Sequence, residues 1–167
     1  MELLFPGIPY EIDPRFREVD FGIFEMHSYD ELKDTPEYQA LLTGDNERNV
    51  PPEGESGQQM ASRVLAAFAQ IEEDTCLVTH GGVIAAIMAD LFPEEGKHRY
   101  QWQSPNGHGY CIMEDRYRAT HLSVETCERN IWLLQNLGGR ICVPWMTSIV
   151  SKRDMKKPST ESRRFFQ

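Results

Sequence analysis

The stretch DTCLVTHGGVIAAIMADLF, residues 74–92, limits the fold of this chain more than any other segment. It predicts a short buried strand over Thr75–Thr79 and, after a Gly-Gly turn, an amphipathic helix that ends before Pro93. A strand that leads directly into such a helix is the repeating unit of an α/β fold with a mainly parallel sheet. Ligands bind to such folds at the carboxyl ends of the strands, and His80 stands at one of them.

The residues at this corner favour an anion. Gly81 and Gly82 let the backbone approach a ligand closely, and the free N–H groups of a helix start attract negative charge. The imidazole of His80 could donate hydrogen bonds to phosphate oxygens or attack phosphorus. The same residues also fit a tight turn beside a structural, partly buried histidine. Taken alone, the corner leaves both interpretations open.

The rest of the chain also divides into short elements. SYDELKDTPEYQALLTG predicts two short helices separated by a Thr-Pro pair. Ser56 and Gln59 form a capping box for a longer helix. The apolar face of that helix carries Met60, Val64, Phe68 and Ile71. GHGYCIMED and RATHLSVET predict two further strands, IPYEI predicts another near the start, and Leu3–Phe5 resemble the last turn of a helix.

Charge separates a body from a tail. The 167 residues carry a formal net charge of −9. Six basic and two acidic residues follow residue 140, a net of +4 that leaves −13 on the first 140. Such an acidic body indicates no nucleic-acid partner and no binding to an anionic membrane. We expect one domain over residues 1–138 and a basic, flexible tail over 139–167.

The four cysteines form no CxxC pair and no spacing typical of a metal site. This pattern indicates a reduced, cytoplasmic protein without a bound metal. No apolar run approaches the roughly 20 residues that span a bilayer. The start, MELLFPG, has no basic region and is not typical of a signal peptide.

Three motifs in order carry a family resemblance. FREVDFGIFE, then PPEGES before the capped helix, then CLVTHGGVIAAI resemble the histidine phosphatase superfamily, the phosphoglycerate-mutase-like proteins. The nearest likeness is to the alpha-ribazole phosphatase-like and general phosphomonoesterase branch, from about Leu3 to about Asp115. The resemblance implies a three-layer α/β/α fold with a mainly parallel sheet. It also implies hydrolysis of a small phosphorylated metabolite through a phosphohistidine, without metal or other cofactor.

The resemblance also assigns residues. It makes Glu18 the proton donor to the leaving oxygen, a role that suits an acid held near an alkoxide. It makes His80 the second histidine of the family, which binds the transferring phosphoryl group, with Gly81, Gly82 and Glu55 around the substrate. The alternative for Glu18 is a solvated surface carboxylate.

The nucleophile of the family has no counterpart here, because the sequence contains no Arg-His-Gly. The family's phosphate-binding arginines also belong to the region before a segment like MELLFPG. We therefore expect a fold that is incomplete at the N-terminus, inactive alone, and prone to self-association through an exposed sheet edge. The explanations left open are a misassigned start, a non-catalytic binding remnant, one half of a split enzyme, or an unrelated α/β protein.

Overall fold

The computed structural model describes residues 7, 9–45, 47–113, 116–121, 140–142 and 148–153. The described helices are α1 (Tyr29–Leu32), α2 (Pro36–Leu42), α3 (Gly57–Phe68) and α4 (Gly81–Leu91), with short 3-10 helices η1 (Pro14–Phe16), η2 (Gly22–Phe24), η3 (Pro93–Glu95) and η4 (Arg99–Trp102). The described strands are β1 (Thr75–Thr79), β2 (His108–Met113), β3 (Arg116–His121), β4 (Arg140–Cys142) and β5 (Ser148–Arg153).

The elements with the clearest local signals form as predicted. The Thr-Pro pair separates α1 from α2, with the proline at the first turn of α2. Ser56 caps α3: its hydroxyl accepts a hydrogen bond from the Gln59 N–H at 3.1 Å, and the Gln59 side chain accepts one from the Ser56 N–H at 2.8 Å. The predicted strands around residues 75, 110 and 118 are also confirmed. Of the expected strand IPYEI, the described residues 9–12 form an isolated bridge at Glu11 and no strand, and Leu3–Phe5 lie outside the described residues.

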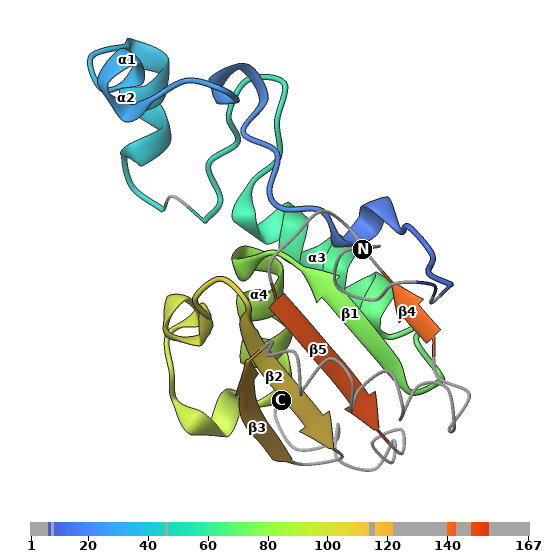
Figure 1. Ribbon diagram of the computed structural model, residues 1–167. Helices are drawn as coiled ribbons and strands as arrows, with labels where there is room; N and C mark the ends of the chain where they lie inside the picture. The colour runs from blue at the N-terminus through green and yellow to red at the C-terminus, as the bar shows by residue number, and fades with distance from the viewer. Residues whose placement is uncertain are drawn as a thin grey trace.

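The five described strands form one mixed sheet in the order β3-β2-β5-β1-β4 (Figure 1). β1 pairs parallel with β4 and antiparallel with β5, while β2 pairs parallel with β5 and antiparallel with β3. The mainly parallel sheet expected from the sequence is therefore wrong for this part of the chain. Two residues separate β2 from β3, which suits an antiparallel hairpin and is too short for a parallel crossover.

Strands β4 and β5 lie within residues 139–167, for which a flexible tail is predicted. The structure differs from that expectation at these strands, because their backbones pair with β1 and β2. β1 therefore has a strand on each side among the described residues. The domain boundary at residue 138, the remainder of the tail and self-association stay predictions.

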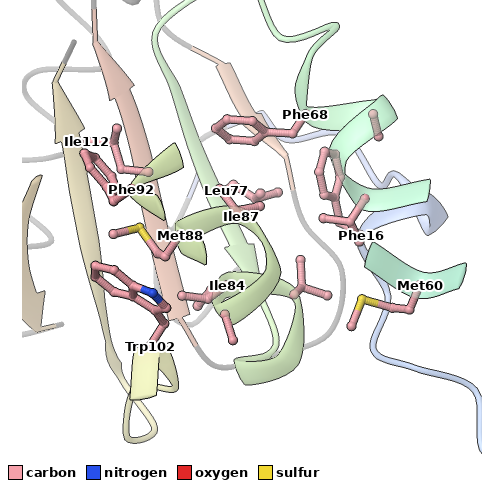
Figure 2. Packing of buried hydrophobic residues seen from close by; sticks show 14 residues of the cluster. Phe16, Met60, Phe68, Leu77, Ile84, Ile87, Met88, Phe92, Trp102 and Ile112 are labelled. Atoms are coloured by element: carbon pink, nitrogen blue, oxygen red, sulfur yellow. The ribbon is translucent and has the colours of Figure 1, made fainter. Parts of the chain in front are cut away.

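Helices α3 and α4 lie against one face of the sheet (Figure 1). All five residues of β1 are buried. In α4, the run Val83–Met88 is buried all around the helix, as expected for a helix covered on more than one side. Figure 2 shows this core, with Leu77, Ile84, Ile87 and Met88 at its centre and Phe16, Met60 and Trp102 around it. The described part of the chain gives an α/β fold, and the three-layer arrangement stays a prediction.

Helices α1 and α2 lie away from the sheet, at the end of an arm formed by residues 20–52 (Figure 1). The arm exposes apolar side chains, including Met26 at 99% and Tyr29 at 66% of their surface. It packs onto itself through an edge-on ring contact between Phe24 and Tyr38, with ring centroids 5.4 Å apart. Among the described residues, no helix has both the length and the apolar character needed to cross a membrane.

Candidate active site

The candidate site lies where β1 ends and α4 begins. His80 is the N-cap residue of α4, with φ −102° and ψ 163°, and its carbonyl accepts the first helical hydrogen bond, from the Ile84 N–H at 3.1 Å. The backbone of His80 is extended, and its side chain is half-buried. The buried β1 on one side and the buried core of α4 on the other fix this corner.

Glu18 reaches the same corner from a segment 64 positions earlier in the chain. One of its carboxylate oxygens accepts a hydrogen bond from the Gly82 N–H at 2.9 Å, and the other accepts one from the Val19 N–H at 3.0 Å. A carboxylate in this place satisfies a free donor of the helix start and is favoured by the helix dipole. Glu18 is therefore a partly buried residue of the corner, and not a solvated surface carboxylate.

The contact with Glu18 explains the glycine at position 82. A Cβ added to Gly82 would lie 2.3 Å from a carboxylate oxygen of Glu18, closer than atoms can approach. At Gly81, a Cβ would meet the Gln103 side chain at 3.2 Å, a contact that a flexible side chain can relieve. The lack of a side chain at position 82 thus leaves room for the Glu18 carboxylate.

Burial lowers the pKa of His80 below its ordinary value of 6.5, and the negative charge of Glu18 opposes that shift without cancelling it. Burial penalises the imidazolium because the charged form loses water that the corner does not replace. The neutral imidazole is therefore the favoured form near neutral pH. A neutral ring can donate from one nitrogen and accept at the other.

Glu55 is bound to a residue that the sequence analysis missed. Its carboxylate forms an ion pair with Arg63 of α3, in which Arg63 Nε donates to Oε2 at 3.0 Å and Nη2 donates to Oε1. Glu55 borders the pocket described below, but its charge is already balanced. Arg63 follows the buried Met60 by three positions and precedes the buried Ala67 by four, and this helical spacing was the available signal.

A pocket of about 360 Å³ opens beside Glu18 and Gly82. Its other walls come from the arm, from the residues before and at the start of α3, from η4 and from the residues next to them: Val19, Phe21, Leu41, Leu42, Glu47, Asn49, Pro51, Glu55, Gly57, Arg99, Tyr100 and Gln103. Arg99 and the Tyr100 hydroxyl both donate to the carboxylate of Glu47. The hydrogen bond from Tyr100 to Glu47 raises the pKa of Tyr100. Glu18 and Gly82 bring the corner to the pocket, and His80 and Gly81 are not among its lining residues.

Other residues with suitable chemistry lie elsewhere. Arg15 donates to Asp13 at 2.7 Å and Arg17 to Asp20 at 3.0 Å, and neither arginine borders the pocket. His108, which has glycines on both sides in the sequence, begins β2, with an exposed side chain. Within the described ranges, no group of three or more His, Cys, Asp or Glu side chains could hold a metal ion.

Comparison with known proteins identifies the class of protein that has this corner. Residues 3–126 match the Histidine phosphatase superfamily (branch 1), and the chain belongs to that superfamily. This confirms the resemblance of the three sequence motifs. Which of the family's roles each residue performs is a separate question, since the comparison assigns no single side chain.

The particular relatives are phosphoglycerate mutase-like proteins and bisphosphatases. The chain is 34% identical over 91 residues to probable phosphoglycerate mutase GpmB of Enterobacter sp. (strain 638), covering 51% of this chain and 42% of that protein. It is 33% identical over 85 residues to 6-phosphofructo-2-kinase/fructose-2,6-bisphosphatase 3 of Bos taurus, covering 49% and 18%. The matched part of the chain thus spans less than half the length of these relatives.

Proposed function

We propose that this chain carries the acid and the phosphate-binding histidine of a phosphomonoesterase site. The observation that supports this most is the position of the Glu18 carboxylate, hydrogen-bonded to the start of α4 beside His80. In this proposal, His80 and the N–H groups of Gly81 and Gly82 bind the phosphoryl oxygens, which requires the Glu18 carboxylate to release the Gly82 N–H when substrate enters. Glu18 accepts two N–H hydrogen bonds as a carboxylate, so it must first take a proton from water. It then gives that proton to the leaving alkoxide, while the P–O bond to the leaving group breaks and a bond from phosphorus to the nucleophile forms.

The parent reaction also needs a nucleophile, which in this superfamily is a histidine that becomes a phosphohistidine and is then hydrolysed by water. The 167 residues contain no Arg-His-Gly to supply it. Loss of a nucleophile lowers the rate by several orders of magnitude. We therefore propose that the chain alone does not turn over substrate. The alternatives are a protein that binds phosphate without turnover and one half of a split enzyme.

The pocket supports a small phosphomonoester with an uncharged leaving group as the substrate class. Glu47 is paired with Arg99, and Glu55 with Arg63, so the described walls offer no unpaired cation for a second phosphate. Apolar side chains such as Val19 and Leu41 supply much of the remaining wall. The cysteine spacing in the sequence is the ground for proposing a reduced, cytoplasmic protein.

Catalysis by the 167-residue chain is tested with an aryl phosphate and with ³¹P NMR for phosphohistidine. We expect neither hydrolysis above buffer nor a phosphohistidine signal. Turnover that disappears in His80→Ala would overturn the proposal and would make His80 the nucleophile.

Binding is tested separately with orthovanadate, a mimic of the phosphoryl group in its transition state. We expect vanadate to shift the imidazole signals of His80 in NMR spectra, and its affinity to fall at least tenfold in His80→Gln. Affinity that is unchanged in His80→Gln would contradict the phosphate-binding role.

The split-enzyme alternative is tested by adding the N-terminal region of probable phosphoglycerate mutase GpmB as a separate polypeptide. Activity that appears on mixing and is lost in Glu18→Gln, but retained in Glu25→Gln, would favour this alternative. No activity on mixing would favour binding without turnover.

A further inference from the structure

The segment that carries Glu18 is fastened to α3 through a single guanidinium. We call residues 15–20 the acid segment. Arg63 Nη1 donates to the carbonyl oxygens of Arg15 at 2.8 Å and Arg17 at 3.0 Å, and Nη2 donates to the carbonyl oxygen of Glu18 at 3.1 Å. The remaining hydrogen bonds of the guanidinium go to Glu55. A guanidinium has five N–H donors, and five hydrogen bonds use them here.

Glu55 holds both the guanidinium and the acid segment. Its backbone N–H donates to the Asp20 carbonyl at 2.9 Å, and its carboxylate accepts a hydrogen bond from the Asp20 N–H at 3.3 Å. Arg63 therefore binds the acid segment before and at Glu18, while Glu55 binds it just after. The pair is largely buried, with side-chain exposures of 22% for Arg63 and 15% for Glu55.

A second attachment fixes only the start of the acid segment. The Thr79 hydroxyl donates to the Phe16 carbonyl at 2.7 Å, and the Phe16 side chain is 1% exposed in the core. This contact lies two residues before Glu18. Without Arg63 and Glu55, the described structure offers the backbone of Glu18–Asp20 few other hydrogen bonds to α3 or β1.

We propose that Arg63 and Glu55 form a clamp that positions the Glu18 carboxylate at the start of α4. The inference rests on the proposed function for the role of Glu18, but the clamp itself is a claim about position and can be tested without catalysis. Arg63 is a positioning residue in this proposal, since it contacts the backbone of Glu18 and no reacting atom. Lysine cannot replace it, because an ammonium lacks the planar fork that reaches carbonyls and a carboxylate together.

The protonation of His80 reports where the Glu18 carboxylate stands. Among the described residues, Glu18 is the charged group that acts on His80, and it makes the imidazolium easier to form. A carboxylate released from α4 loses that effect, so the pKa of His80 falls further. A purely structural role for Arg63 would change stability but leave this titration in place whenever the variant is folded.

The experiment follows the His80 imidazole signals by NMR across pH in the full chain and in Glu18→Gln, Arg63→Met, Arg63→Lys and Glu55→Gln. We expect Glu18→Gln to lower the pKa of His80, and both Arg63 variants to lower it by a similar amount. Glu55→Gln keeps the shape of the side chain and removes its charge, so a smaller fall in the same direction is expected. Adding Arg63→Met to Glu18→Gln should give no further fall.

Arg48→Met is the matched control, because Arg48 lies on an exposed ion pair with Asp45 and should leave the titration of His80 unchanged. A shift in Glu18→Gln with no shift in any folded Arg63 or Glu55 variant would overturn the clamp and leave the proposed function intact. No shift in Glu18→Gln would overturn both, because the carboxylate would then not face His80. If Arg63→Met does not fold, Arg63→Lys and Glu55→Gln decide the question by the same comparison.

Discussion

At the scale of single residues, the corner depends on contacts between positions that are far apart in the chain. His80 could be predicted as a candidate site residue because a histidine between a strand and a Gly-Gly helix start is a local pattern, and its role stays a prediction. Glu18 could be placed only through the family resemblance. The helical spacing of Arg63 could place it on the inner side of α3, but not its role, since its partners include carbonyl oxygens 45 to 48 positions away that the sequence does not identify.

The buried hydroxyl of Thr79 gives the first prediction. Thr79→Val keeps the shape of the side chain and removes the donor to the Phe16 carbonyl, which leaves a buried acceptor without that partner. Such losses cost about 1–3 kcal/mol. We expect the free energy of unfolding of Thr79→Val, measured in urea, to be lower by this amount. Thr43→Val, at an exposed hydroxyl bonded to the Gln39 carbonyl, should change stability far less, and equal losses in the two variants would contradict the argument.

The titration of His80 gives the second prediction. Its pKa in the folded chain lies below the ordinary 6.5, so between these two values the unfolded chain binds a proton that the folded chain does not. Stability should therefore fall as pH drops through about 6.5, and the His80 contribution should level off below its folded pKa. Urea unfolding measures the free energy of unfolding at pH 7.5 and at pH 5.0. The decrease between these two pH values should be smaller for His80→Gln than for the unaltered chain. An equal loss in both would contradict the prediction.

At the scale of elements, local signals predicted α3, α4 and β1 well. The capping box of Ser56 and the helical spacing of Met60, Val64 and Phe68 are contained within one stretch of chain. The arrangement of the strands is different, because whether two distant strands pair parallel or antiparallel is decided by tertiary packing. One neighbour of β1, the strand β5, comes from SIVSKR, a polar and basic stretch that favoured a tail over a strand.

The capping box gives the third prediction. Ser56→Ala removes the oxygen that accepts from the Gln59 N–H at the start of α3, and loss of such a cap costs about 1 kcal/mol. Ser62→Ala is the matched control in the same helix, since its exposed hydroxyl donates only to the Gln58 carbonyl. We expect a lower midpoint of urea unfolding for Ser56→Ala than for Ser62→Ala. Identical midpoints would show that the cap contributes nothing.

At the scale of the whole molecule, β5 joins the two halves of the sheet. Its residue Val150 pairs with Leu77 of β1 on one side and with Tyr110 of β2 on the other. The described part of β1 and β2 has no direct pairing between them in the strand order. The integrity of the sheet therefore depends on a segment for which the sequence predicts a flexible tail.

That dependence gives the fourth prediction. Val150→Pro removes a backbone donor from a central strand, where proline is not accommodated. We expect the free energy of unfolding to fall by at least about 1–3 kcal/mol. We also expect oligomers on size-exclusion chromatography. Val150→Thr keeps the donor and a β-branched side chain, and should remain close to the unaltered chain. A Val150→Pro chain with unchanged melting and size would show that the segment is a tail in solution.

The all-round burial of α4 and the pairing of β1 on both sides have a consequence for the order in which the molecule opens. Amide protons in this unit can exchange with deuterium only when most of the core opens, whereas those of the exposed arm can exchange through small local openings. We therefore expect the amides of β1 and α4 to exchange more slowly than those of α2, which places Leu41 and Leu42 on the wall of the pocket. A ligand could then enter and leave by displacing the arm, while the corner formed by β1 and α4 stays in place.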